Sequence, residues 1–256
     1  MRFKLLAIAW TVLTAVALPA QSLRIYCEDD PPMQIRAADG SLSGMTVEMV
    51  REIQKRVGNQ DPIEMVPWAR GYEALGRERN TVLFSMGRTA ERDALFQWVG
   101  PIAESTFGLY ARADSPLMIR TLEDAKRVRA IGVYRDDIRD QFLTRAGLAN
   151  LDRTNDNVTN FKKLMLGRID LFASSSNDIK ANAEGAGYTL ADVKLSHVFL
   201  RTQIFIAFSR KTDPAIVARW NAALKAMKKD ATFQALFRKY YPDRPFPGPE
   251  VSAFQP

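Results

Sequence analysis

The sequence has very little cysteine and histidine, which limits the chemistry it can support. Among 256 residues, Cys27 is the only cysteine and His197 the only histidine. A single cysteine excludes an internal disulfide, so stability has to come from a hydrophobic core. Cys27 lies in an apolar run and is expected to be buried, and His197 lies in an alternating run typical of a half-exposed strand. No Gly-x-Ser-x-Gly segment, the motif of a serine nucleophile, occurs in the sequence. We therefore predict that the protein is not an enzyme.

Metal-ligand spacing is also missing. Glu28, Asp29 and Asp30 are adjacent, and three consecutive carboxylates cannot all face one ion. We therefore predict no metal and no cofactor. The formal charge of +7 is spread along the chain, with the densest basic segments at 225–230 and 237–244. We interpret these segments as solvated helix faces and expect no nucleic-acid partner.

Long hydrophobic runs are absent after the first 20 residues. Arg2 and Lys4 precede the apolar run 5–18, and small residues follow near Ala20. This is the pattern of a secretory signal peptide, which we predict over residues 1–20. An uncleaved anchor is the alternative, although the run is short for a bilayer. The mature protein is expected in the periplasm.

Strand and helix patterns alternate along the rest of the chain. A helix is expected over 45–58, where apolar residues share one face and Gly58 is a plausible C-cap. Strands are expected at 23–27, 62–68, 81–87, 107–113, 129–134, 169–174, 194–200 and 203–209. This alternation predicts an α/β fold with mostly parallel sheets and flanking helices.

The order of these elements suggests two lobes with a chain that leaves the first and returns to it. We expect lobe 1 to comprise residues 22–110 and 207–242, and lobe 2 to comprise 111–206. The prolines of segment 243–256 predict an irregular C-terminal tail.

Several ordered motifs resemble the extracytoplasmic solute-binding proteins of family 3, the amino-acid-binding type. They are "EDDPPM" (28–33), "DGSLSGMTVEMVREIQKRVG" (39–58), "SMGRTAERDALFQWVGP" (85–101), "LEDAKRVRAIGVYRDD" (122–137), "NFKKLMLGRIDLFAS" (160–174) and "ATFQALFRKYYPD" (231–243). The resemblance implies a type II periplasmic-binding-protein fold with two crossing hinge strands. It also implies a monomer that delivers a small polar carboxylate ligand to an ABC permease. A sensor-associated binding protein and a cyclic-acid dehydratase on the same fold are the alternatives.

One segment is predicted to hold the carboxylate of the ligand. It follows the strand over 81–87, and ligands of open α/β sheets lie beyond the carboxyl ends of strands. Ser85 and Thr89 offer hydroxyl groups, and Gly87 permits close backbone approach. The resemblance assigns the bidentate carboxylate contact to Arg92. Whether neighbouring Arg88 is a second anion contact or an exposed turn residue stays open.

Two further residues follow the strand over 62–68. Trp68 is expected to form a wall of the cleft, and Arg70 is expected to add positive electrostatic potential there. Core packing for Trp68 and full solvation for Arg70 are the alternatives.

The chain departs from the family pattern where an amino acid's ammonium group would bind. Asp30 replaces an aromatic residue, and Ser175 stands where an acid is usual. The loop at Arg135, Asp136 and Asp137 replaces a Gly-Thr pair. Because an unpaired ammonium in a dry cleft is costly, we hypothesise that Asp30, with Asp136 or Asp137, binds it. The competing hypothesis is a ligand without an ammonium group.

Overall fold

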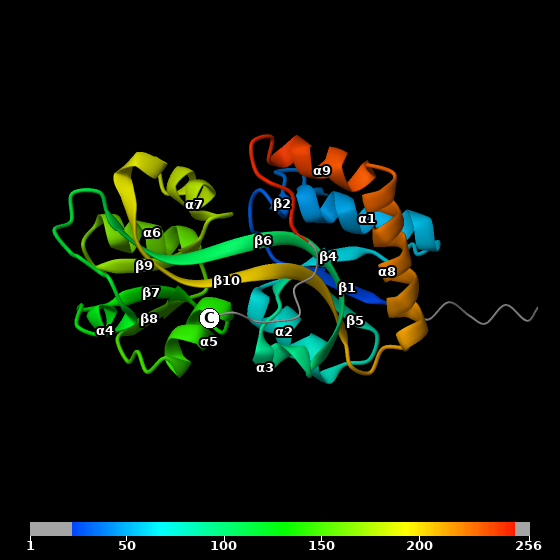
Figure 1. Cartoon of the computed structure of the whole chain (residues 1–256), viewed down its shortest axis with the longest axis horizontal. Coiled ribbons are helices and arrows are strands. Elements are labelled where there is room, and N and C mark those ends of the chain that lie inside the picture. The colour runs from blue at the N-terminus through cyan, green and yellow to red at the C-terminus, as the bar shows by residue number, and fades with distance from the viewer. Residues whose placement is uncertain (1–21, 249–256) are drawn as a thin grey trace, which may run out of the picture.

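The computed structural model describes residues 22–248 and shows two lobes joined by two long strands (Figure 1). The predicted signal peptide, 1–20, lies outside the described residues, as does the end of the tail from residue 249. Within the described part of the chain, no helix has the length and apolarity needed to cross a membrane.

The first lobe is built on three parallel strands. β1 (Arg24–Cys27) lies between β4 (Ile63–Met65) and β5 (Thr81–Gly87). A small hairpin precedes the first helix and consists of β2 (Ile35–Arg36) and β3 (Leu42–Ser43). The helices of this lobe are α1 (Met45–Val57), α2 (Trp68–Arg77), α3 (Ala90–Asp93), α8 (Pro214–Lys229) and α9 (Thr232–Tyr240).

The second lobe repeats this plan with β7 (Ile131–Tyr134) between β8 (Leu151–Thr154) and β9 (Leu171–Ser175), again in parallel. Its helices are α4 (Leu122–Ala125), α5 (Ile138–Arg145), α6 (Asn157–Met165) and α7 (Ile179–Gly185), followed by the 3₁₀ turn η1 (Leu190–Asp192). The α/β class predicted from the alternating pattern is confirmed.

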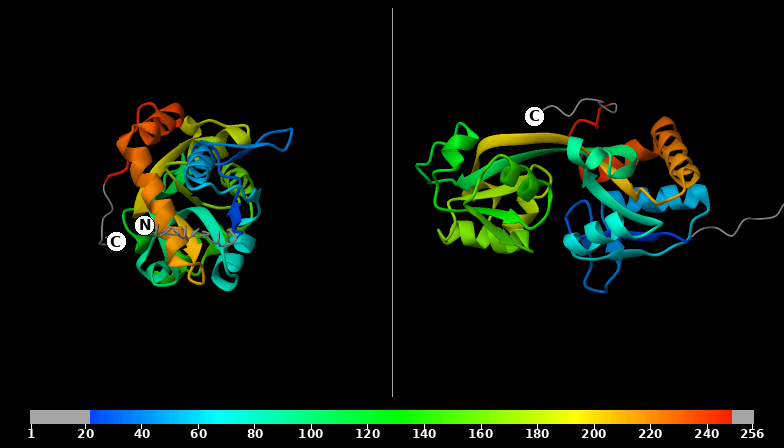
Figure 2. Two further views of the ribbon diagram at one scale, coloured as in Figure 1. Left: turned by 90° about the vertical axis from the view of Figure 1, so that its right-hand side faces the viewer. Right: turned by 90° about the horizontal axis from the view of Figure 1, so that it is seen from below.

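Two strands of 17 residues connect the lobes: β6 (Phe96–Arg112) and β10 (Val193–Ser209). They pair with each other in antiparallel fashion and complete one eight-stranded sheet in the order β4-β1-β5-β10-β6-β9-β7-β8. Figure 2 shows that they link the lobes along one side. The expectation of separate strands at 194–200 and 203–209 was therefore wrong. The lobe limits at 110/111 and 206/207 stay a prediction.

Local sequence signals explain where the helices begin and end. Gly58 has a left-handed backbone (φ 70°) and terminates α1, as the sequence predicted. Asp213 caps α8 by accepting a hydrogen bond from the backbone N–H of Ala215, and Pro214 occupies the first turn. Cys27 is fully buried in the core of the first lobe, and this burial raises the pKa of its thiol to about 12.

Candidate ligand cavity between the lobes

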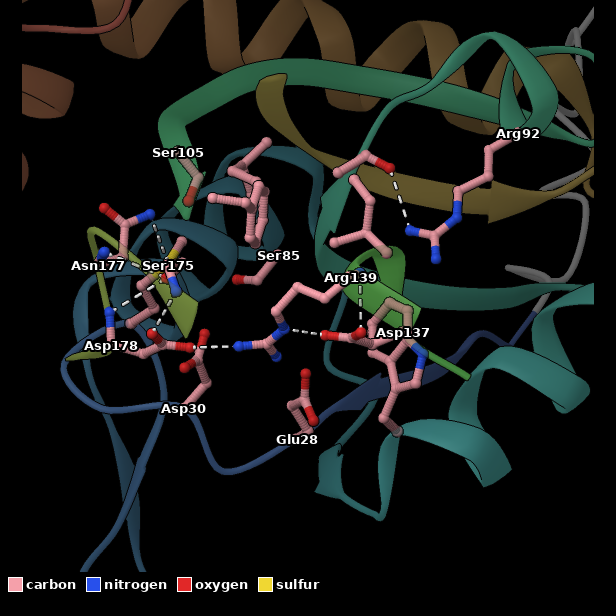
Figure 3. Close-up of a pocket in the computed structure, with 16 residues that line it drawn as sticks. Glu28, Asp30, Ser85, Arg92, Ser105, Asp137, Arg139, Ser175, Asn177 and Asp178 are labelled. Atoms are coloured by element: carbon pink, nitrogen blue, oxygen red, sulfur yellow. Dashed lines mark hydrogen bonds and ion pairs between the residues drawn. The ribbon is translucent and has the colours of Figure 1, made fainter. Parts of the chain in front are cut away.

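A polar cavity lies between the lobes, near the carboxyl ends of β1, β5, β7 and β9 (Figure 3). Its free volume is about 40 Å³, room for about three water molecules. A solute of amino-acid size can therefore enter only when the lobes move apart. The first lobe contributes Glu28, Asp30, Met33, Trp68, Ser85, Gly87 and Arg92; the second contributes Asp137, Ile138, Arg139, Ser175, Asn177 and Asp178; the crossing strands contribute Ser105, Phe107 and Ile204.

The guanidinium of Arg139 occupies the centre of the cavity (Figure 3). It forms ion pairs with Asp137 and, at 2.9 Å, with Asp178. All three side chains are buried, and the two neighbouring carboxylates hold the pKa of Arg139 above its usual value despite its burial. Our sequence analysis missed Arg139. The available signal was its position in the first turn of a helix that follows a buried strand, where the carboxyl ends of the sheet converge.

Asp178 lies close to Ser175, the position at which the family pattern usually has an acid. Oδ1 of Asp178 accepts hydrogen bonds from Ser174 Oγ at 2.7 Å and from the backbone N–H of Ser175 at 2.9 Å. The Ser175 hydroxyl accepts in turn from the backbone N–H groups of Asn177 and Asp178. A tight turn thus places the carboxylate three residues beyond the expected position, and Ser175 shapes that turn.

Arg92 lines the cavity from the short helix α3 and is 2% exposed. Its Nη1 donates to the Gly87 carbonyl at 3.2 Å, and its Nη2 donates to Gln141 Oε1 in the second lobe at 3.0 Å. The guanidinium also packs over the rings of Trp68 and Tyr72. Among residues 22–248 it forms no ion pair with a carboxylate. Burial without such a partner lowers its pKa.

Ser85 and Gly87 line the cavity at the end of β5. Ser85 has a left-handed backbone (φ 63°), and its hydroxyl accepts from Gln34 Nε2 and donates to Thr46 Oγ1 at 2.9 Å. A Cβ at position 87 would lie 2.6 Å from Cδ1 of Ile138 in the second lobe. Position 87 therefore needs a residue without a side chain because the two lobes meet here. This requirement is separate from the close approach of a ligand.

Trp68 forms one wall of the cavity and also bridges the lobes. Its Nε1 donates to the backbone carbonyl of Asp136 at 3.1 Å, and the same carbonyl accepts from Gln141 Nε2. The first of these bonds joins the two lobes, and the second lies within the second lobe.

Four of the predicted site residues do not line the cavity: Arg70, Thr89, Arg135 and Asp136. Arg70 is exposed on α2, which is the solvated alternative. Thr89 is the N-cap of α3 and accepts from the backbone N–H of Arg92. Arg135 is exposed and donates to Asn155 Oδ1, and Asp136 contributes its backbone carbonyl to the lobe contact. Asp136 has a left-handed backbone (φ 59°), and this turn leaves Arg135 and Asp136 exposed while the next residue, Asp137, lines the cavity.

The cavity holds more acidic than basic groups. Glu28, Asp30, Asp137 and Asp178 face two guanidiniums, those of Arg92 and Arg139. Burial, and next the Asp178 carboxylate, raise the pKa of Asp30 to about 8. Burial and the Asp30 carboxylate likewise raise the pKa of Glu28. Both shifts arise because buried carboxyl groups lie close together, and a cation beside them would favour their ionised forms. Across residues 22–248, no three His, Cys, Asp or Glu side chains are grouped so that they could hold a metal ion.

The fold and the interlobe cavity together define a two-lobed binding protein of the periplasmic type. Residues 23–243 match the family described as bacterial extracellular solute-binding proteins, family 3, and the chain belongs to that family. The chain is 25% identical over 214 residues to the L-cystine-binding protein TcyJ of Escherichia coli K12. The alignment covers 82% of this chain and 79% of TcyJ.

The solved structures that share this fold include a sensor domain and an ancestral binding protein. A histidine kinase sensor domain with similarity to periplasmic binding proteins superposes with a TM-score of 0.78 and 21% sequence identity. The aligned region covers 86% of this chain and 96% of the sensor domain. The ancestral amino acid-binding protein AncCDT-1, a precursor of cyclohexadienyl dehydratase, has a TM-score of 0.71 and 20% identity, over 86% and 95% of the two chains. At these identities the likeness concerns the fold alone.

Proposed function

We propose that the protein captures a small solute with both a carboxylate and an ammonium group, and presents it to an ABC permease in the periplasm. The observation that carries this proposal is the separation of charge in the cavity. Arg92, which has no carboxylate partner among the described residues, faces the site from the first lobe. The carboxyl groups of Asp30 and Glu28 line the site from the same lobe, and burial and neighbouring carboxylates raise the pKa of each.

The role of each residue follows from this separation. The Arg92 fork would exchange Gln141 for the ligand carboxylate, to which it can donate two parallel hydrogen bonds. The ligand ammonium would lie against Asp30, since Asp137 and Asp178 are already paired with Arg139. The name of the E. coli relative, an L-cystine-binding protein, supports an amino acid as the solute class. The proposal therefore adopts the hypothesis of a ligand with an ammonium group over the alternative without one.

Thermal unfolding with three matched compounds tests the proposal. L-Lysine carries an α-carboxylate and an α-ammonium, cadaverine lacks the carboxylate, and 6-aminohexanoate lacks the α-ammonium. We expect L-lysine to raise the melting temperature more than either truncated compound, because only it satisfies both ends of the site. Equal shifts with all three, or none, would reject the proposal. Loss of uptake of the bound solute in cells lacking the protein would separate transport from sensing.

One observation favours a second candidate, a dehydratase acting on a cyclic acid. Such a reaction needs a general acid in the cleft, and Asp30, with a pKa of about 8, would hold a proton at neutral pH. Incubation with cyclic hydroxy acids, monitored by the ultraviolet absorbance of the unsaturated product, tests it. Turnover abolished by Asp30→Asn would favour this candidate over binding alone.

A further inference from the structure

The C-terminal segment, residues 242–248, follows α9 and turns toward the crossing strands (Figure 1). Arg238, on α9, holds this segment, because its Nη1 donates to the backbone carbonyl of Arg244 at 2.7 Å. The ring of Phe246 packs against that of Phe237, also on α9, with the two centroids 5.3 Å apart. These contacts anchor the C-terminal segment on the first lobe.

Arg244 extends from this segment to the second lobe. Its guanidinium donates to the backbone carbonyl of Ser176 and to Asn177 Oδ1, and both acceptors belong to the loop between β9 and α7. The guanidinium also lies over the ring of Tyr241, 4.5 Å from the ring centroid, which restricts its movement. One side chain of the C-terminal segment therefore joins the first lobe to the second.

Asn177 is the residue at which this contact meets the cavity. Its side chain lines the cavity and is buried. Its Nδ2 donates to the backbone carbonyl of Glu104, on β6, at 3.2 Å and lies 3.8 Å from Sδ of Met33 in the first lobe. Glu104 Oε1 in turn accepts from the backbone N–H of Gly248 at 2.8 Å. Because Arg244 binds the other end of the amide, Asn177 is held between the C-terminal segment, a crossing strand and the first lobe.

The loop that Arg244 contacts also carries Asp178, whose carboxylate pairs with Arg139 at the centre of the cavity. The hydroxyl of Ser175 accepts from the backbone N–H groups of Asn177 and Asp178, so these residues form one compact turn. A displacement of Asn177 would therefore move the Asp178 carboxylate with it. The contact made by Arg244 outside the cavity thus bears on the position of charge inside it.

We propose that Arg244 is a positioning residue of the ligand cavity, which holds the second-lobe loop 175–178 against the first lobe and so stabilises the closed form. Arg244 does not line the cavity, so its replacement should act on closure and not through a lost contact with the solute. Without this residue the lobes should open more often, and a bound solute should dissociate faster. The effect on the solute rests on the proposed function, whereas the effect on closure concerns the chain alone.

Distances between spin labels on the two lobes test closure without any solute. Arg70→Cys on α2 and Lys162→Cys on α6 place labels at exposed positions, and buried Cys27, with a thiol pKa of about 12, should stay unlabelled. We expect double electron–electron resonance to show a larger population of long distances in Arg244→Met than in the wild type. Arg219→Met, at an exposed arginine on α8, is the matched control and should keep the wild-type distribution. The same distribution in Arg244→Met and the wild type would overturn the inference.

Binding kinetics with L-lysine, measured by surface plasmon resonance, test the consequence for the solute. We expect Arg244→Met to raise the dissociation rate constant about fivefold or more and to change the association rate constant less than about twofold. Arg244→Lys keeps a charged donor without the planar fork and should lie between Arg244→Met and the wild type. A chain ending at residue 241 should resemble Arg244→Met, and one ending at residue 248 should resemble the wild type. Unchanged dissociation in Arg244→Met would overturn the inference, whereas failure of the wild type to bind L-lysine would count against the proposed function and leave the spin-label distances to decide the inference.

Discussion

Nη1 of Arg139 lies 2.9 Å from Oδ2 of Asp178, and both side chains are buried between the lobes. Asp137 takes the other side of the same guanidinium. Two carboxylates thus pair with Arg139 at the centre of the cavity, whereas Arg92 has no carboxylate partner within residues 22–248. The two arginines therefore differ in their ionic partners, and the predictions for Arg92 and Arg139 depend on this difference.

The first prediction concerns Arg92. Arg92→Lys keeps a positive charge but loses the planar fork, so we expect the affinity for a zwitterionic solute to fall by about tenfold or more. Arg70→Lys is the matched control, because Arg70 is exposed outside the cavity and its replacement should leave the affinity unchanged. Calorimetric titration with a solute identified by thermal shift measures both. Similar affinities for the two variants would contradict a carboxylate clamp at Arg92.

The second prediction concerns the stability of the Arg139 cluster. Arg139→Met leaves Asp137 and Asp178 buried without their partner and should lower the free energy of unfolding by about 3–5 kcal/mol. The triple variant Arg139→Met, Asp137→Asn, Asp178→Asn removes the uncompensated charge and should recover much of that loss. Urea unfolding followed by fluorescence gives both values. No recovery in the triple variant would show that packing, rather than charge, accounts for the loss.

The third prediction is a pH dependence of stability. Asp30 has a pKa of about 8 in the folded protein, because of burial and next the Asp178 carboxylate, against about 3.9 in an unfolded chain. Between these pH values the folded state keeps a proton that the unfolded state has lost. The free energy of unfolding should therefore fall as the pH rises from about 4 to 8, by at most about 1.4 kcal/mol per pH unit from this group.

Asp30→Asn isolates this contribution. Urea unfolding at several pH values should give a flatter profile for Asp30→Asn than for the wild type, while Asp114→Asn, at an exposed acid outside the cavity, keeps the wild-type slope. Wild-type and Asp30→Asn profiles with the same slope would refute the assignment. A cationic solute should in addition release a proton from Asp30 on binding, which titrations in buffers of different ionisation enthalpy would detect.

The fourth prediction concerns lobe closure. Gly87→Ala places a Cβ against Cδ1 of Ile138, which belongs to the opposite lobe. We expect solute affinity to fall about tenfold, because the added carbon opposes the closed form, with little change in the stability of either lobe. The double variant Gly87→Ala, Ile138→Val lacks the clashing Cδ1 and should regain most of the affinity. If Gly87→Ala binds as tightly as the wild type, the contact does not limit closure.

Much of the fold was predictable because it depends on local signals. The apolar face of α1 and the left-handed Gly58 that ends it, the Asp213 cap of α8, and the short buried strands follow from periodicity and capping chemistry. The continuity of β6 was not predictable in this way. Gly100 and Pro101 interrupt its pattern, and only pairing with β10 along its length makes it one strand.

The site was predictable to the extent that its residues end buried strands of the first lobe. Trp68, Ser85, Gly87 and Arg92 follow such strands, and they line the cavity. Arg139 and Asp178 lie at the starts of helices that follow buried strands of the second lobe, but the sequence does not show that the two side chains face each other. Arg135 and Asp136 are exposed and do not line the cavity, because the left-handed turn at Asp136 decides which side chain of this segment points inward, and the sequence does not reveal that turn.

The sequence by itself determined most of the short strands and helices, the α/β class and the family resemblance, because capping and hydrophobic periodicity act between residues a few positions apart. Tertiary structure alone decided which charges meet. Arg139 is paired with two carboxylates, Arg92 has no carboxylate partner within residues 22–248, and the pKa of Asp30 is raised, because the fold brings these groups together and limits their access to water. Burial and the distance between charges set those properties, and neither quantity exists before the chain is folded.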